Sequence, residues 1–362
     1  MSEPTVRAIR AVAVEVPLRY VLGTSAAAVR AEPLLLVDVD TEEGITGRTY
    51  LFCYVPAAAP AIVSLLTAVE AAVKGERIAP DKLWALLAKR FRLIGVQGIV
   101  RMAMSAFDTA CWDALAIAAN VPLVEFLGGT RRPIPAYNSC GLGLMPAAAL
   151  ADEAEQLLAG GFSAVKLRLG YPTLEEDIAA LHAVKRRVPA AIRIMVDFNQ
   201  ALTVDEALRR GRALDDEGVY WIEEPVRHDD YRGAATLARE LATPIQLGEN
   251  FSEPPAMAEA LEMRACDYVM PDLERIGGVT GWRAAAALAA TRAVPMSSHL
   301  FPEVSAHLLA VTPTAHWLEY VDWARAIVEE PLAIVDGNAV IPARPGNGLA
   351  WNREAVARYR MK

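Results

Sequence analysis

Hydrophobic and polar positions divide the chain into two stretches with different periodicities. In the first stretch, strand patterns occur at 6–16, at 33–40 (PLLLVDVD) and, after the polar turn 41–44, at 45–52. Three helical patterns follow, at 57–74, 80–88 and 96–119. Strands followed by helices predict a small α+β domain that occupies residues 1–130.

From residue 131 onward, short apolar runs alternate with alanine-rich amphipathic segments. The candidate strands lie at 134–137, 164–169, 192–197, 220–224, 245–249, 268–270, 295–299 and 317–320. About eight strand–helix repeats in a little under 200 residues predict a TIM-like barrel over residues 131–325. A doubly wound open sheet is the alternative, but no G-x-G-x-x-G motif opens a helix after any of these strands. Residues 326–362 contain a further strand pattern and are expected to form a tail that packs back on the first domain.

Composition narrows the class of protein. The chain has 362 residues, 54% of them hydrophobic, and 36 Lys and Arg against 44 Asp and Glu give a net charge of -8. These values predict a large core, and the acidic balance argues against a nucleic-acid partner. The four cysteines, Cys53, Cys111, Cys140 and Cys266, lack the paired spacing of a disulfide framework or a zinc motif. The N-terminus does not read as a signal peptide, so a cytoplasmic protein with no membrane partner is expected.

Three acidic residues end three successive predicted strands at equal spacing. Asp197 ends IRIMVD, Glu223 ends VYWIE and Glu249 ends PIQLGE, with 26 residues from each to the next. One βα unit has about this length, so the three side chains are expected at the carboxyl ends of neighbouring barrel strands. A charge after an apolar run is costly unless it is paired or bound to metal. Converging carboxylates predict a Mg²⁺ site, although three helix N-caps would use the same residue types.

Charged residues on the flanking strands extend this pattern. Lys166 and Arg168 lie two positions apart in VKLRLG and therefore point to the same side of one strand. Asp272 and His299 end two adjacent strands, so the carboxylate can orient the imidazole and raise the basicity of its second nitrogen. Glu319 ends the last predicted strand. Cations on one side of a metal and a His–Asp pair on the other suit the removal of an α-proton.

The chain resembles the enolase superfamily, and within it the mandelate racemase branch, through motifs along its whole length. These are YLFCY, KLRLGYP, MVDFNQ, WIEEP, GEN, MPDLERIGGVTGW, PMSSHLF and PTAHWLE. The resemblance implies an α+β capping domain, a (β/α)7β barrel and one essential Mg²⁺. It also implies a small-molecule carboxylate substrate and an even-numbered homo-oligomer, possibly an octamer.

The same resemblance implies a role for each matching residue. Asp197, Glu223 and Glu249 match the metal ligands, and His299 with Asp272 matches the catalytic dyad. Lys166 and Glu319 match the groups that neutralise and hydrogen-bond the substrate carboxylate. Further matches imply a substrate-binding role for Ser139 and Asn199 in the barrel and for Leu22, Ala26, Val29 and Tyr54 in the cap.

One position departs from the racemase pattern Lys-x-Lys, because Arg168 stands where the second lysine would be the base for the other face of the substrate. A guanidinium has a pKa above about 12 and resists deprotonation far more than an ammonium group. Arg168 therefore favours one-base chemistry from His299, such as a dehydratase of a hydroxy acid or acid sugar. The mostly apolar cap residues favour mandelate-racemase-like racemisation of a 2-hydroxy acid, so an isomerase is the expected class and a one-base hydro-lyase is the alternative.

Three other classes fit the residues less well. A Schiff-base aldolase using Lys166 would leave the three carboxylates without a role. A retaining glycosidase would need a second carboxylate where His299 stands. A non-catalytic barrel would follow if Arg168 prevented turnover.

Overall fold

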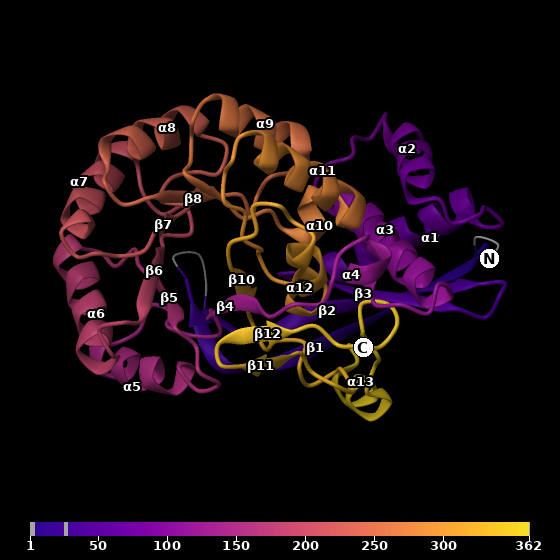
Figure 1. Ribbon diagram of the computed structural model, residues 1–362, viewed down its shortest axis with the longest axis horizontal. Coiled ribbons are helices and arrows are strands. Elements are labelled where there is room, and N and C mark those ends of the chain that lie inside the picture. Colours follow the sequence, from indigo (N-terminus) through magenta and orange to yellow (C-terminus); the bar gives the residue numbers. More distant parts are fainter. Residues whose placement is uncertain (1–3, 25–27, 362) are drawn as a thin grey trace.

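The computed structural model describes residues 4–24 and 28–361, which form a small α+β part beside a larger barrel (Figure 1). Three antiparallel strands make the sheet of the α+β part, in the order β1 (Val6–Gly23), β2 (Ala28–Thr41) and β3 (Thr46–Phe52). The first two strands are longer than predicted. Beyond residue 16 they continue as a two-stranded arm, in which Leu22 pairs with Val29. Backbone hydrogen bonds between β1 and β2 hold the arm together, and its sequence lacks the regular hydrophobic alternation by which a strand can be predicted.

Helices α1 (Ala58–Val73) and α3 (Ile99–Ala118) pack against this sheet, and α2 (Pro80–Phe91) packs on both of them. These three helices correspond to the predicted patterns, whereas the short α4 (Leu123–Phe126), which contacts α3, was not predicted. Almost every residue of α3 is buried, because α3 contacts β3 and α1 on one side and barrel helices on the other. A helix that is apolar nearly all round suits this central place.

The second part is a closed barrel of parallel strands. The strands are β4 (Ile134–Asn138), β5 (Ala164–Arg168), β6 (Arg193–Asp197), β7 (Ile222–Glu223), β8 (Ile245–Leu247), β9 (Tyr268–Val269) and β10 (Leu318–Tyr320). Sequential strands from β4 to β9 pair in parallel, and β10 pairs with β4. The predicted strand at 295–299 makes only isolated parallel bridges, through Met296 and His299, which complete the ring between β9 and β10. The (β/α)7β barrel with an α+β cap is therefore confirmed.

Helices surround the barrel strands, as Figure 1 shows. They are α5 (Ala147–Leu157), α6 (Leu174–Arg187), α7 (Val204–Asp215), α8 (Tyr231–Glu240), α9 (Pro254–Glu262), α10 (Leu273–Ile276), α11 (Gly278–Thr291) and α12 (Pro302–Ala310). The sixth crossover is split in two at Gly277, whose φ of 112° is open to glycine and strained for other residues. No helix among the described residues is long and apolar enough to cross a membrane.

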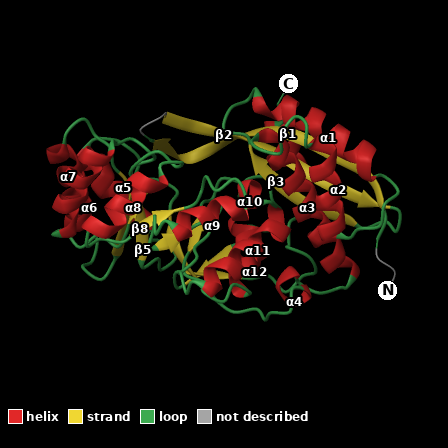
Figure 2. Ribbon diagram, turned by 90° about the horizontal axis from the view of Figure 1, so that it is seen from above, coloured by secondary structure: helices red, strands yellow, loops and turns green. Residues whose placement is uncertain are grey.

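The C-terminal residues contact both parts of the molecule, and Figure 2 shows the C-terminus on the side of the cap sheet. The hairpin of β11 (Ala333–Val335) and β12 (Asn338–Val340) adds antiparallel to the start of β4. Helix α13 (Arg353–Tyr359) contacts β1, and the indole of Trp351 donates a 2.7 Å hydrogen bond to Asp38 on β2. This segment therefore links the barrel to the cap.

Aromatic side chains fill the barrel beneath the carboxyl ends of its strands. Tyr137, Trp221 and Trp317 form one buried cluster with Met195 and Ala164. The indole nitrogen of Trp221 donates a 3.1 Å hydrogen bond to Glu223, and the ammonium of Lys166 lies 6.0 Å from the centre of the Tyr137 ring. The charged groups at the strand ends therefore lie directly on a layer of buried aromatic side chains.

Candidate active site

The three predicted metal ligands converge at the carboxyl ends of neighbouring strands. Asp197 ends β6, Glu223 ends β7, and Glu249 follows β8 by two residues. One carboxylate oxygen from each lies within 4.8 Å of the others, and the first two residues are fully buried. None of them caps a helix, so the N-cap interpretation is wrong. A set of converging carboxylate oxygens is the donor set that hard divalent cations such as Mg²⁺ prefer.

Lys166 on β5 lies among these carboxylates. Its Nζ is 2.6 Å from Glu223 Oε1, 2.8 Å from Glu319 Oε1 and 3.2 Å from Asp197 Oδ2, and the side chain is 1% exposed. Burial alone would lower the pKa of Lys166, but the three carboxylates raise it above its ordinary value. Lys166 is therefore held as a cation among these carboxylates.

Burial also raises the pKa of Glu223, and the neighbouring acids Asp197, Glu319 and Glu249 raise it further, against the opposing effect of Lys166. A bound divalent cation would favour the ionised form of such a group. The electrostatics of the cluster thus agree with a metal site.

The predicted dyad is present. His299 Nδ1 lies 2.6 Å from Asp272 Oδ2, while the other oxygen of Asp272 accepts the backbone N–H groups of Glu274 and Arg275 as the N-cap of α10. Asp272 is thereby fixed, and it directs Nε2 of His299 toward Glu249 (3.4 Å). Burial lowers the pKa of His299, but nearby carboxylates outweigh this effect and raise it to about 9. The imidazole is thus both oriented and made more basic.

Glu319 and Ser139 connect the two ends of the barrel ring. Ser139 Oγ donates a 2.8 Å hydrogen bond to Glu319 Oε1, and Glu319 Oε2 accepts the backbone N–H of Leu300. Burial would raise the pKa of Glu319, but Lys166 and His299 hold it below the ordinary value. Glu319 is therefore ionised and is fixed between the cationic side of the site and the dyad.

Arg168 is buried beside Lys166 but has different partners. Its Nη1 donates to the backbone carbonyls of Ser139 (3.0 Å) and Gly141 (2.6 Å), and its Nη2 donates to Ser139 Oγ (2.9 Å). Both terminal nitrogens of Arg168 therefore already donate to acceptors of the loop after β4, and none of these three contacts is to a metal ligand. Arg168 is therefore a hydrogen-bond donor that its three acceptors hold in one position.

The remaining predicted residues lie around this core. Asn199 follows β6 and donates to Asp197 from both its backbone and side-chain nitrogens (2.8 and 3.1 Å). In the cap, Leu22 is buried, Val29 beside it is partly buried, and Tyr54 is 42% exposed. Ala26 lies outside the described residues. The arm that carries Leu22 contacts the loop after β4, where the N–H of Leu144 donates to the carbonyl of Gly23 (2.8 Å).

Three residues that were not predicted extend the metal cluster toward the cap. Glu224 is fully buried and accepts both 3.0 Å hydrogen bonds from the amide of Asn250, which also contacts Glu249. Arg275 donates to Asn250 Oδ1 and to the backbone carbonyl of Glu249, and its guanidinium lies 4.9 Å from the centre of the Tyr54 ring. The second acid in WIEEP was the available signal for Glu224. Asn250 lies in the turn after β8 and Arg275 in the short helix α10, and neither had a signal of its own in the sequence.

Comparison with known proteins agrees with this site. Residues 6–128 match the family described as mandelate racemase / muconate lactonizing enzyme, N-terminal domain, and residues 149–355 match the family described as enolase C-terminal domain-like. A solved enolase from Bradyrhizobium, complexed with magnesium and mandelic acid, is similar over 100% of both chains, with 41% identity and a TM-score of 0.96.

Two curated relatives have different activities. A 3,6-anhydro-alpha-L-galactonate cycloisomerase from Streptomyces coelicolor is 32% identical over 352 residues, 95% of this chain and 96% of the relative. An L-talarate/galactarate dehydratase from Salmonella typhimurium is 33% identical over 276 residues, 76% of this chain and 69% of the relative. The two family matches, the barrel and the carboxylate cluster together place the chain in the enolase superfamily, in its mandelate racemase/muconate lactonizing enzyme subgroup.

Proposed function

We propose that this enzyme uses His299 as a single base to remove the proton α to a substrate carboxylate, and that the resulting enolate loses a β-hydroxyl group as water. The observation that carries this proposal is the contrast between His299 and Arg168. His299 is oriented and made basic by Asp272, whereas Arg168 donates three hydrogen bonds to fixed acceptors. One base on one face of the substrate supports elimination and does not support two-base racemisation.

Residues at the ends of the barrel strands would stabilise the negative charge that develops on the substrate carboxylate. Asp197, Glu223 and Glu249 would hold Mg²⁺, which as a Lewis acid polarises a substrate carboxylate and stabilises negative charge on it. Lys166 adds a fixed positive charge beside the metal site, and Glu319, which accepts a hydrogen bond from Ser139, holds that ammonium group in place. His299 takes the α-proton on Nε2, and it can return that proton to the departing hydroxyl group so that water leaves.

Polar side chains beside the metal cluster support a hydroxylated acid as the substrate. Asn199, Asn250 and Arg275 place amide and guanidinium groups beside the metal cluster. Polar groups of this kind suit a hydroxylated acid, and the Salmonella relative dehydrates such acids.

Racemisation of a 2-hydroxy acid is the second candidate. The apolar residues Leu22 and Val29 at the arm of the cap favour it, as does the similarity to the Bradyrhizobium structure with mandelic acid. It requires a second base, and Arg168 is the residue at the corresponding position.

Deuterium exchange separates the two candidates. Each enantiomer of mandelate, which has no β-hydroxyl group, is incubated with enzyme and Mg²⁺ in D₂O and followed by ¹H NMR. Galactarate and related hydroxy acids are tested in parallel for 2-keto-3-deoxy products. We expect stereospecific exchange without racemisation, and elimination from one hydroxy acid.

Controls define what would overturn the proposal. His299→Asn and exhaustive chelation should abolish both signals, whereas His182→Asn, at a half-exposed histidine hydrogen-bonded to Glu217, should abolish neither. Exchange from both enantiomers together with racemisation would refute the one-base mechanism. Full turnover after chelation would refute the role of the metal.

A further inference from the structure

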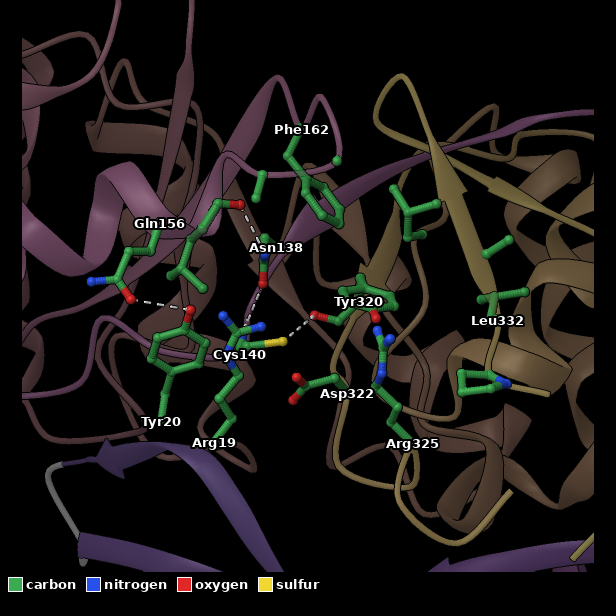
Figure 3. Close-up of a pocket in the computed structure, with 16 residues that line it drawn as sticks. Arg19, Tyr20, Asn138, Cys140, Gln156, Phe162, Tyr320, Asp322, Arg325 and Leu332 are labelled. Atoms are coloured by element: carbon green, nitrogen blue, oxygen red, sulfur yellow. Dashed lines mark hydrogen bonds between the residues drawn. The ribbon is translucent and has the colours of Figure 1, made fainter. Parts of the chain in front are cut away.

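A second cavity lies outside the barrel, where β1 of the cap, helix α5 and strand β11 meet (Figure 3). Its volume is about 460 Å³, within the range of small-molecule sites. Phe162, Leu332 and Ile334 supply apolar surface to it. The cavity is separate from the metal cluster, because none of the three metal ligands lines it.

The cavity lies directly behind two strands that carry active-site residues. Glu319 faces the barrel interior on β10, and the next residue, Tyr320, lines the cavity. At the end of β4, Ser139 contacts Glu319, while Asn138 and Cys140 on either side of it line the cavity. Alternation along a strand thus gives one backbone two faces, one toward the metal cluster and one toward the cavity.

Positive charge dominates the lining. Its charged residues are Arg19 on β1 and Arg325 and Asp322 after β10, two cations against one anion in a chain whose net charge is -8. Both arginines are exposed, and neither forms an ion pair with any residue in the described part of the chain. In Figure 3 these three side chains lie along one side of the cavity, and Phe162 lies on the opposite side. The cavity therefore has a cationic side and an apolar side.

Neutral polar groups complete the cationic side. The Tyr20 hydroxyl is 3.5 Å from Gln156 Oε1, which is at the limit of a hydrogen bond. Tyr20 can thus donate to an incoming acceptor at little cost. Arginine and tyrosine donors at the mouth of an apolar cavity are the groups that recognise a carboxylate on a compact apolar body.

We propose that this cavity is a second binding site, specific for a small organic monoanion whose carboxylate contacts Arg19 and Arg325 and whose apolar or aromatic body packs against Phe162, Leu332 and Ile334. The excess of one positive charge sets the preference for a monoanion.

Calorimetric titration of the full-length protein with benzoate tests the proposal. EDTA is present so that metal-dependent binding at the barrel site does not contribute. We expect one benzoate site whose affinity falls about tenfold or more in the double variant Arg19→Gln/Arg325→Gln, because charge-assisted hydrogen bonds are lost. Ala333→Trp, which fills the cavity and keeps both arginines, should also remove binding. Arg186→Gln, at an exposed arginine on α6, is the charge-matched control and should bind as the wild type does.

Four results would overturn the proposal. They are unchanged affinity in the double variant, equal binding of uncharged benzyl alcohol, no benzoate binding by the wild type, and a sedimentation shift to smaller species in Ala333→Trp. The last result would show that a second copy of the chain occupies the cavity. These outcomes do not depend on the proposed reaction, since no turnover is measured.

Discussion

Replacement of Lys166 by methionine should have opposite effects on the metal-free protein and on Mg²⁺ affinity. The ammonium of Lys166 contacts Glu223 Oε1 and Asp197 Oδ2, at 2.6 and 3.2 Å, and both residues belong to the metal cluster. In the metal-free protein Lys166 therefore neutralises the cluster, and it competes with a metal ion for the same oxygens. Lys166→Met removes the neutralising charge and the competitor together.

The distances set the size of both effects. Unit charges about 3 Å apart at an effective dielectric constant of about 20 attract by about 5–6 kcal/mol before desolvation is counted. Removal of one partner from a buried pair costs about 3–5 kcal/mol, which is the expected loss in the free energy of unfolding without metal. A divalent ion about 4 Å from an ammonium group is repelled by about 8 kcal/mol on the same scale. Even if Lys166 relieves most of this repulsion by turning toward Glu319, Mg²⁺ should bind at least about tenfold more tightly to the variant.

Two measurements check this prediction. Urea unfolding in EDTA reports the loss of stability, and calorimetric titration with Mg²⁺ from pH 7 to 9 reports affinity. The gain in affinity should increase with pH, because protons that replace Lys166 on the carboxylates must leave before the metal binds. Arg168→Met is the matched control: it removes a cation from the same strand whose guanidinium contacts Ser139 and Gly141 and none of the metal ligands. Weaker Mg²⁺ binding by Lys166→Met across this pH range would refute the competition.

Three further predictions concern the second base, the cap and acid stability. Arg168→Lys should introduce deuterium exchange from the second mandelate enantiomer, because the pKa of a lysine lies about 2 or more units below that of an arginine. If ¹H NMR in D₂O shows no new exchange, the side chain at position 168 does not reach the α-carbon. Asp113→Ala should lower the free energy of unfolding in urea by about 2–4 kcal/mol, because Asp113 accepts the backbone N–H groups of Arg48 and Asn347, and an unchanged midpoint would contradict this. Burial lowers the pKa of His307 to about 4. As pH falls below 6.5, this histidine is therefore protonated in the unfolded chain but stays neutral in the folded one, which destabilises the fold. From pH 7 to 5 the wild type should lose about 2 kcal/mol more stability than His307→Gln, and parallel pH profiles would argue against this role.

The spacing of carboxylates was sufficient to find the centre of the site. In a parallel barrel each strand delivers its last residues to the same end, so Asp197, Glu223 and Glu249 had to meet once the βα repeat was recognised. The same logic placed Asp272 beside His299, and the two residues form a parallel bridge. Strand ends are predictable because the chain topology alone determines their neighbours.

Residues whose neighbours are set by side-chain packing between loops were not predictable in this way. Arg275 reaches Asn250 and the Tyr54 ring, although 25 residues separate it from the first and more than 200 from the second. No periodicity connects these positions, because each lies beyond the end of a strand and its partners depend on how the cap packs on the barrel. The backbone N–H of Phe52 in the cap donates a hydrogen bond to Glu274, two residues after Asp272. This contact also depends on how the cap packs on the barrel. The barrel thus fixes the metal cluster and the His299–Asp272 pair through topology, whereas the groups between cap and barrel are set by packing that needs the complete structure to be seen.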